Sequence, residues 1–233
     1  MGVPTSVDLL LSSGYLAFAR HIGFLNAVDA LSSLHVDALV GTSSGALIGA
    51  LWASGIRGDE LATLISRRPP LSYLSLRVAG GLFSLDPMIE FLSDHLPARF
   101  EELSTPLAVG VVNDEKQYQL LSSGSLPEAV AASCAVPYLF KPIVMNQITY
   151  RDGGVSDRVG WGAWRAWRPQ RTPAQALVHW VDRTHGRDLS LPSEATVIRS
   201  PRSRAHLWSL GPFWDQVDES EALARATLLT THG

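Results

Sequence analysis

The segment from Val40 to Leu47, which reads V-G-T-S-S-G-A-L, constrains the fold of this chain more than any other. It contains the pattern G-x-S-x-G, follows an apolar run at residues 36–40 and precedes a helical pattern of apolar residues. A strand, a sharp turn and a helix form the setting in which a serine acts as a nucleophile. The flanking glycines relieve Cβ clashes at the turn, and the helix start offers free N–H groups near the serine oxygen. Ser43 is therefore the candidate nucleophile, with a small-residue turn before a buried helix as the plainer alternative.

Three further motifs lie on either side of this segment. L-S-S-G-Y-L-A-F at Leu11–Phe18 is followed by H-I-G-F-L at residues 21–25. Later come A-A-S-C-A-V-P-Y-L-F-K-P at Ala131–Pro142 and Y-R-D-G-G-V at Tyr150–Val155. In this order the motifs resemble the patatin-like phospholipase family, which has a glycine-rich loop, G-x-S-x-G, A-S-x-A-x-P-x-x-F-x-P and then D-G-G or D-G-A. The resemblance extends over about residues 7 to 182.

This resemblance implies a catalytic dyad rather than a triad. Ser43 and Asp152 match the two residues of the dyad, in which the aspartate takes the serine proton directly, with no histidine between them. Ser13, Gly14 and Tyr15 match the loop whose backbone N–H groups bind the oxyanion. The alternative for Asp152 is an ordinary D-G turn at the end of a strand.

The first loop departs from the family pattern. Gly14 is the only glycine kept there, Phe18 stands where a further glycine is usual, and Ala17 stands where Arg or Lys is common. After Asp152, this chain has Arg158 and Gly160 where the family often has Asn and Pro. We expect these departures to affect the rate and the choice of substrate more than the fold. The bulky side chains of the first loop are expected to narrow the site.

A histidine triad is the competing arrangement. His179 and His185 follow Asp152, and the order Ser, Asp, His suits an α/β-hydrolase. Ser43, however, follows only the second predicted strand, which is early for that fold. His179 alternates with apolar neighbours as a core or edge residue does, and His185 lies in a predicted turn.

The sequence predicts no cofactor. No group of histidines and cysteines has metal-ligand spacing, and the first loop does not match a phosphate-binding or dinucleotide-binding pattern. The single cysteine, Cys134, lies in an apolar run and is expected to be a buried small residue. It permits no internal disulfide, which favours a reducing compartment.

Bulk properties favour one enzyme domain over residues 1–233, with a C-terminal helical segment at about 202–231. The net charge of −3 argues against nucleic acid as a partner. No apolar run is long enough for a transmembrane helix, and no signal peptide is evident. We expect a cytoplasmic protein, with peripheral contact at a membrane left open.

Periodicity predicts an α/β protein. Apolar runs predict strands at residues 7–11, 36–40, 106–112, 117–121 and 176–181. Helical spacing predicts helices at residues 18–31, 44–53, 57–67, 86–95, 126–133 and 217–231. This alternation indicates a three-layer fold in which helices cover both faces of a mainly parallel sheet.

Two segments have two interpretations each. Tryptophans and arginines gather at Trp161–Arg171, either as a surface for lipid headgroups or as an amphipathic helix with buried tryptophans and solvated arginines, which we favour. The irregular apolar stretch at residues 71–83 is either part of an acyl channel or lid, or an ordinary loop.

The sequence therefore predicts a serine acyl hydrolase that cleaves an ester of a lipid or lysophospholipid substrate. The competing class is a lipid-binding or interaction protein that keeps the fold and the dyad but has lost the oxyanion geometry. The sequence leaves the headgroup, the acyl length and the oligomeric state open.

Overall fold

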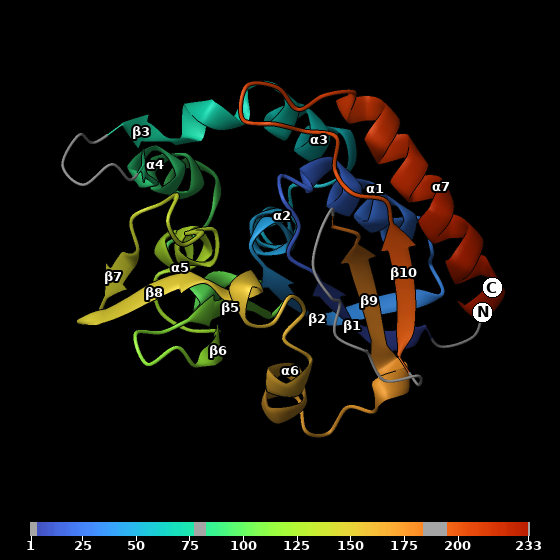
Figure 1. Cartoon of the computed structure of the whole chain (residues 1–233). Coiled ribbons are helices and arrows are strands. Elements are labelled where there is room, and N and C mark those ends of the chain that lie inside the picture. Colours follow the sequence, from blue (N-terminus) through green and yellow to red (C-terminus); the bar gives the residue numbers. More distant parts are fainter. Residues whose placement is uncertain (1–3, 77–82, 184–194, 233) are drawn as a thin grey trace.

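A single large sheet forms the centre of the protein. The computed structural model describes residues 4–76, 83–183 and 195–232 (Figure 1). The strands of the sheet follow the order β10-β9-β1-β2-β5-β8-β7, and β6 pairs with β5 beside this path. The bounds are β1 (Thr5–Leu11), β2 (Leu34–Thr42), β5 (Leu107–Val112), β6 (Tyr118–Leu121), β7 (Ile143–Met145), β8 (Ile148–Asp152), β9 (Ala176–Val181) and β10 (Thr196–Ser200).

Most of this sheet is parallel. The pairs β10–β9, β9–β1, β1–β2 and β2–β5 are parallel, whereas β6 and β8 run antiparallel to β5, and β7 runs antiparallel to β8. A separate two-stranded sheet pairs β3 (Ser75–Leu76) with β4 (Phe83–Ser84). The carboxyl ends of β1, β2 and β9 therefore meet at one edge, where an α/β protein of this kind builds its site.

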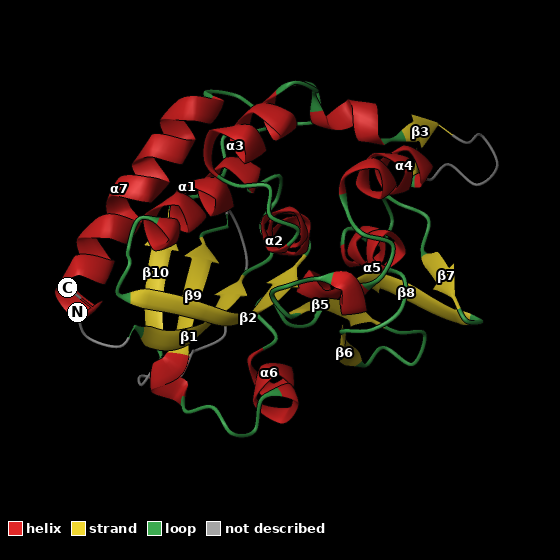
Figure 2. Ribbon diagram, turned by 180° about the vertical axis from the view of Figure 1, so that it is seen from behind, coloured by secondary structure: helices red, strands yellow, loops and turns green. Residues whose placement is uncertain are grey.

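Helices cover the two faces of the sheet unequally. Figures 1 and 2 show α6 alone on one face, with the other helices on the opposite face. The bounds are α1 (Phe18–Asp29), α2 (Ser44–Ala53), α3 (Gly58–Ser66), α4 (Asp86–His95), α5 (Leu126–Ser133), α6 (Trp161–Trp167) and α7 (Phe213–His232). The predicted three-layer α/β architecture is confirmed.

Two hydrophobic cores lie on the two faces of the sheet. Side chains alternate along a strand, so Leu9 and Leu11 of β1 join the larger core, which includes the buried faces of α1 and α2. Leu10, between them, joins the smaller core, where it lies with Trp164 of α6 and Trp180 of β9. Strands buried on both faces explain why the sequence shows mainly apolar runs instead of strict alternation.

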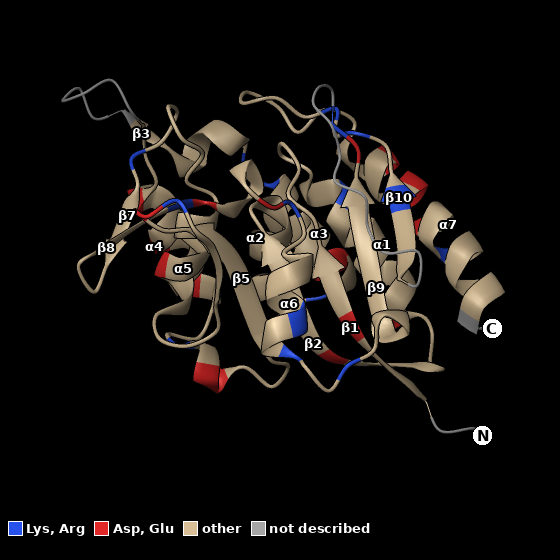
Figure 3. Cartoon of the chain, turned by 60° about the horizontal axis from the view of Figure 1, so that its bottom comes forward, with Lys and Arg blue, Asp and Glu red and all other residues tan. Residues whose placement is uncertain are grey.

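The segment from Trp161 to Arg171 forms an amphipathic helix and the loop that follows it, which is the interpretation that we favoured from the sequence. Trp164 is fully buried, and its Nε1 donates to Asp8 Oδ2 at 2.9 Å. The prediction of solvated arginines is wrong for two of them. Arg168 Nε lies 3.0 Å from Asp8 Oδ2, and Arg171 pairs with both Asp8 and Asp37. Figure 3 shows basic positions around the end of α6 near acidic positions on β1 and β2. The Asp8 carboxylate is buried, and these paired cations offset the cost of burying its charge.

The C-terminal helix α7 packs along α1. A Cβ atom on Gly23 of α1 would lie 2.1 Å from the Val217 carbonyl oxygen, so glycine permits the close approach of the two helices. Arg20 Nη1 lies 2.8 Å from Glu219 Oε2, and Ser220 Oγ donates to the Arg20 carbonyl at 2.7 Å. Among the helices of the described ranges, none is both long and apolar enough to cross a bilayer.

Candidate active site

Ser43 lies in a strained turn between β2 and α2. Its backbone has φ 55° and ψ −118°, a left-handed conformation that L residues adopt at a cost of about 1–3 kcal/mol. Neighbouring glycines permit close packing of the turn: a Cβ on Gly41 would lie 2.6 Å from Ala46 Cα, and one on Gly45 would lie 2.4 Å from the Leu11 carbonyl oxygen. The strain is therefore at the serine itself, and the glycines supply the space around it.

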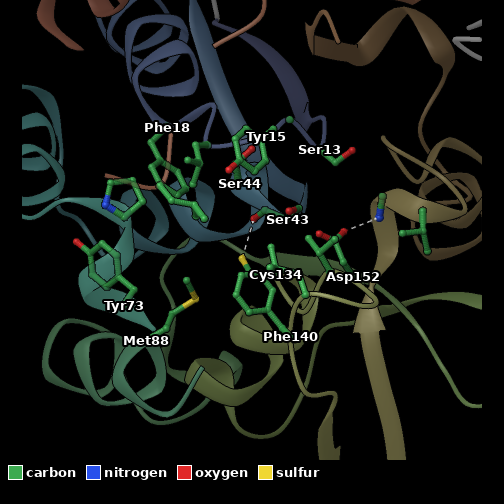
Figure 4. Close-up of a pocket in the computed structure, with 18 of the residues that line it drawn as sticks. Ser13, Tyr15, Phe18, Ser43, Ser44, Tyr73, Met88, Cys134, Phe140 and Asp152 are labelled. Carbon is green, nitrogen blue, oxygen red and sulfur yellow. Dashed lines mark hydrogen bonds between the residues drawn. The ribbon is translucent and has the colours of Figure 1, made fainter. Parts of the chain in front are cut away.

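Two residues from the end of α5 hold this turn. The Ser43 N–H donates to Ser133 Oγ at 2.8 Å, and the Ser133 hydroxyl donates to the Gly110 carbonyl of β5 at 2.7 Å. Cys134 Sγ donates to the Ser43 carbonyl at 3.4 Å (Figure 4). Cys134 is buried, as predicted, and burial raises the pKa of its thiol well above the usual value. Sequence reasoning treated Ser133 only as part of a motif and missed this direct contact with the turn.

Asp152 ends β8 and faces Ser43. Its N–H donates to the Ala135 carbonyl at 3.0 Å, and its Oδ1 accepts the Gly154 N–H at 2.7 Å (Figure 4). Ser43 and this carboxylate line the same cavity, and the Ser43 side chain is close enough to lower the pKa of Asp152. A Cβ on Gly154 would lie 2.5 Å from Ser13 Oγ, so glycine allows the turn after Asp152 to lie against the first loop.

Burial controls the charge of Asp152. The residue is 4% exposed, and burial raises the pKa of its carboxyl to about 6, although the nearby Ser43 side chain and the Gly154 N–H act in the opposite direction. A carboxyl with this pKa is mostly ionised at pH 7. Its pKa is close enough to 7 that the group can accept a proton and later release it. A carboxylate with such a pKa beside a serine is suited to accept a proton.

The first loop, between β1 and α1, brings Ser13, Gly14 and Tyr15 to the same cavity as Ser43. The Ser13 N–H donates to the Arg158 carbonyl at 2.7 Å and so already has an acceptor. In the part of the chain that the structure describes, the N–H groups of Gly14 and Tyr15 donate to no backbone oxygen. Of the three residues expected to bind an oxyanion, Gly14 and Tyr15 therefore have backbone N–H groups without a backbone acceptor.

The cavity beside Ser43 has a volume of about 320 Å³. Ser43 and Asp152 line one part of it, and the side chains labelled in Figure 4 extend it into an apolar pocket. The apolar lining includes Phe18, Tyr73, Leu74, Met88, Leu139 and Phe140. Tyr73 and Leu74 belong to the irregular stretch at 71–83, whose residues 77–82 lie outside the described ones.

Histidine does not contribute to the described lining of this cavity. His179 is fully buried in β9, where its Nδ1 lies 2.8 Å from His21 Nδ1 and its Nε2 lies 2.9 Å from Ser200 Oγ. Burial lowers the pKa of His179 well below its usual value and that of His21 to about 3, so both rings are neutral. His185 lies outside the described residues. Within those residues, no three potential metal ligands lie together.

Comparison with known proteins assigns the chain to a family. The family model of patatin-like phospholipases matches residues 9–163, so the chain belongs to the patatin-like phospholipase family. Uncharacterized NTE family proteins of Mycobacterium bovis and Mycobacterium tuberculosis are 27% identical over 159 residues. These matches cover 65% of this chain but 43% of each relative, so the chain spans less than half of the relatives' length.

Two solved structures have the same fold. VipD from Legionella pneumophila superposes with a TM-score of 0.55 and 14% identity, over 98% of this chain and 67% of VipD. The heterodimeric ExoU–SpcU complex from the type III secretion system of Pseudomonas aeruginosa superposes with a TM-score of 0.51 and 13% identity, over 99% of this chain and 52% of the matched chain. At this level of identity the likeness concerns the fold alone.

Proposed function

We propose that this protein is a serine acyl hydrolase that cleaves carboxylic esters of lipids or lysophospholipids. The observation that carries the proposal is the placement of Ser43 beside the buried Asp152 carboxylate, where both residues line an apolar cavity. The strained turn at Ser43 and membership of the patatin-like phospholipase family support the same chemistry.

In the proposed first step, Asp152 accepts the proton of the Ser43 hydroxyl while Ser43 Oγ attacks the ester carbonyl carbon. The carbonyl oxygen becomes an oxyanion, which the N–H groups of Gly14 and Tyr15 stabilise. Collapse of the tetrahedral intermediate breaks the ester C–O bond, and Asp152 gives its proton to the departing alkoxide. The products of this step are a free alcohol and an acyl-Ser43 ester.

In the second step, water replaces the alcohol. Asp152 accepts a proton from this water as its oxygen attacks the acyl carbon, and the same two amides bind the oxyanion. Collapse releases the fatty acid and returns the Asp152 proton to Ser43 Oγ. The cycle needs only ester and water, which agrees with the expectation that no cofactor takes part.

The lining of the cavity favours a lipid as the substrate. Most of the side chains that line the cavity are apolar. Tyr15 and Val155 also line it, and they are 60% and 58% exposed. Exposed apolar side chains at the mouth of an apolar pocket suit an acyl chain that enters from a lipid surface. Peripheral contact with a membrane is therefore part of the proposal, whereas the cytoplasmic location stays a prediction from the sequence.

Phe18→Ala is expected to widen acyl-chain tolerance. Phe18 lines the cavity and is 5% exposed, so its loss enlarges the pocket and also costs about 3–5 kcal/mol of stability. The ratio of kcat/KM for long-chain to short-chain esters should rise roughly tenfold, since one methylene in a pocket contributes about 1–3 kcal/mol. Phe100→Ala removes an equally buried ring that does not line the cavity, and it should leave this ratio unchanged. Equal ratios in the two variants would contradict the proposed role of Phe18.

Hydrolysis separates the proposal from the lipid-binding alternative. The wild type should hydrolyse a short-chain nitrophenyl ester and members of a lipid panel, and Ser43→Ala should not. Binding of lipid vesicles without turnover of any ester would favour the binding protein. Product analysis across the panel then identifies the headgroup and the ester position.

A further inference from the structure

Arg158 places a buried guanidinium group against the first loop, where the residue also lines the cavity beside Ser43. The residue is 7% exposed and follows Asp152 on the segment that leads to α6. Its Nη2 donates to the Ser13 carbonyl at 2.6 Å and to the Val181 carbonyl at 2.5 Å, while its Nε lies 3.4 Å from Ser13 Oγ. The guanidinium also lies over the Trp180 ring, 4.6 Å from its centroid. Arg158 therefore joins the first loop to the end of β9.

The backbone of this segment adds a reciprocal contact. The Ser13 N–H donates to the Arg158 carbonyl, so Ser13 and Arg158 hold one another through both main chain and side chain. Asp157 fixes the turn that presents Arg158, because its Oδ1 accepts the N–H groups of Val159 and Gly160, each at 2.9 Å. Burying a guanidinium is costly unless its hydrogen bonds are satisfied, and here two backbone carbonyls accept hydrogen bonds from Nη2.

These contacts have a direct effect on the next peptide group. In a planar trans peptide, the C=O of Ser13 and the N–H of Gly14 point in opposite directions. When Arg158 holds the Ser13 carbonyl, the Gly14 N–H is directed away from Arg158. In the described part of the chain this N–H donates to no backbone oxygen, and Gly14 lines the cavity beside Ser43.

We propose that Arg158 is a positioning residue that orients the Gly14 amide for the oxyanion. The proposal rests on the proposed hydrolase function and deepens it. Ala17 leaves the loop without its usual basic side chain, and serine replaces glycine at position 13. Arg158 supplies a cation and a fixed geometry from a segment far away in the sequence. Because that segment begins at Asp152, it couples the position of the base to the position of the oxyanion donors.

Variants of Arg158 test this role against a matched control. Arg158→Met should lower kcat about 100-fold, the effect of losing an oriented oxyanion donor, and leave KM within a few-fold, because the oxyanion exists only in the transition state. Arg158→Lys keeps the charge but not the fork of donors and should lower kcat about tenfold. Arg171→Met removes another buried arginine, one that pairs with Asp8 and Asp37, and should keep the wild-type kcat even if it melts earlier.

Hydrogen exchange gives a readout that is independent of turnover. Amides at residues 12–18 should exchange faster in both Arg158 variants and at the wild-type rate in Arg171→Met. Unchanged exchange in folded Arg158→Lys, or a kcat of Arg158→Met within threefold of the wild type, would overturn the proposal. If Arg158→Met fails to fold, the kcat and the amide exchange of Arg158→Lys provide the test. If the wild type turns over no ester, the proposed function fails, while the exchange rates still decide whether Arg158 holds the loop.

Discussion

Ser43→Ala is expected to reduce ester hydrolysis to background, a loss on the order of a million-fold, as when a serine hydrolase loses its nucleophile. The change removes the oxygen that attacks the ester and leaves the turn, its hydrogen bond to Ser133 and the cavity in place. A fluorophosphonate probe should accordingly label the wild type and not the variant. Mass spectrometry of the labelled peptide identifies the modified residue.

The serine that follows the other end of α2 provides the control. Ser54 follows the last turn of the helix, where its Oγ donates to the Ala50 carbonyl, so Ser54→Ala should label and hydrolyse as the wild type does. Equal labelling of Ser43→Ala and the wild type would rule out Ser43 as the nucleophile. Ser43→Gly should also raise the free energy of unfolding by about 1 kcal/mol, because glycine accepts the left-handed backbone without strain.

The strands that build the site could be predicted because they are buried on both faces. β1, β2, β5 and β9 appear in the sequence as mainly apolar runs, in which Asp8, Asp37 and His179 are the polar exceptions, and each run lies where a strand was predicted. β10, at Thr196–Ser200, was missed because this edge strand is short and mixes polar with apolar residues. Periodicity is weak in such a strand, and pairing with β9 determines its structure.

The hairpin formed by β7 and β8 shows a different limit. The run at residues 142–150 contains all of β7 and the first three residues of β8. The turn between them places Asn146 and Gln147 at φ 50° and 67°, the backbone of a type I′ turn. The sequence signal for that turn is Asn-Gly or Asp-Gly, so Asn-Gln gave no indication of two strands.

Motifs identified the residues that carry the proposed chemistry, but not those that hold them. Ser43 and Asp152 each lie in a local sequence pattern that predicts a backbone turn. Ser133 contacts the Ser43 amide across 90 residues, and Arg158 contacts Ser13 across 145. Contacts of this kind depend on how the sheet brings loops together, and a single sequence contains no local signal for them.

Asp152→Asn is expected to lower kcat/KM at least about 100-fold, the usual scale of a general base. Asparagine keeps the shape of the side chain and its acceptor oxygen toward Gly154 but cannot take the Ser43 proton. His179→Gln and His185→Asn should stay within a few-fold of the wild type if they fold. A large loss from either histidine variant with intact folding would favour a triad instead.

The pH profile distinguishes Asp152 from a histidine. Because only the ionised carboxylate accepts a proton, wild-type kcat/KM should fall about tenfold per pH unit below pH 6 and level off above it. An inflection near pH 6 is often attributed to histidine, but burial keeps His21 and His179 neutral across this range. Asp152→Asn should lose this inflection, and its persistence would assign the titration to another group.

Asp152→Asn should be more stable to unfolding than the wild type at pH 8. Burial raises the pKa of Asp152 from 3.8 to about 6, so the folded protein binds this proton more tightly than the unfolded chain does. Above about pH 6 the buried charge therefore lowers the free energy of unfolding of the wild type by its full amount. This destabilisation disappears as the pH falls toward 4 and the carboxyl becomes protonated. Asparagine has no such charge, so Asp152→Asn should raise the free energy of unfolding at pH 8 by about 1–3 kcal/mol. Denaturant titrations at pH 8 and pH 4 measure this: the advantage should shrink at pH 4, and an equal difference at both values would contradict the raised pKa.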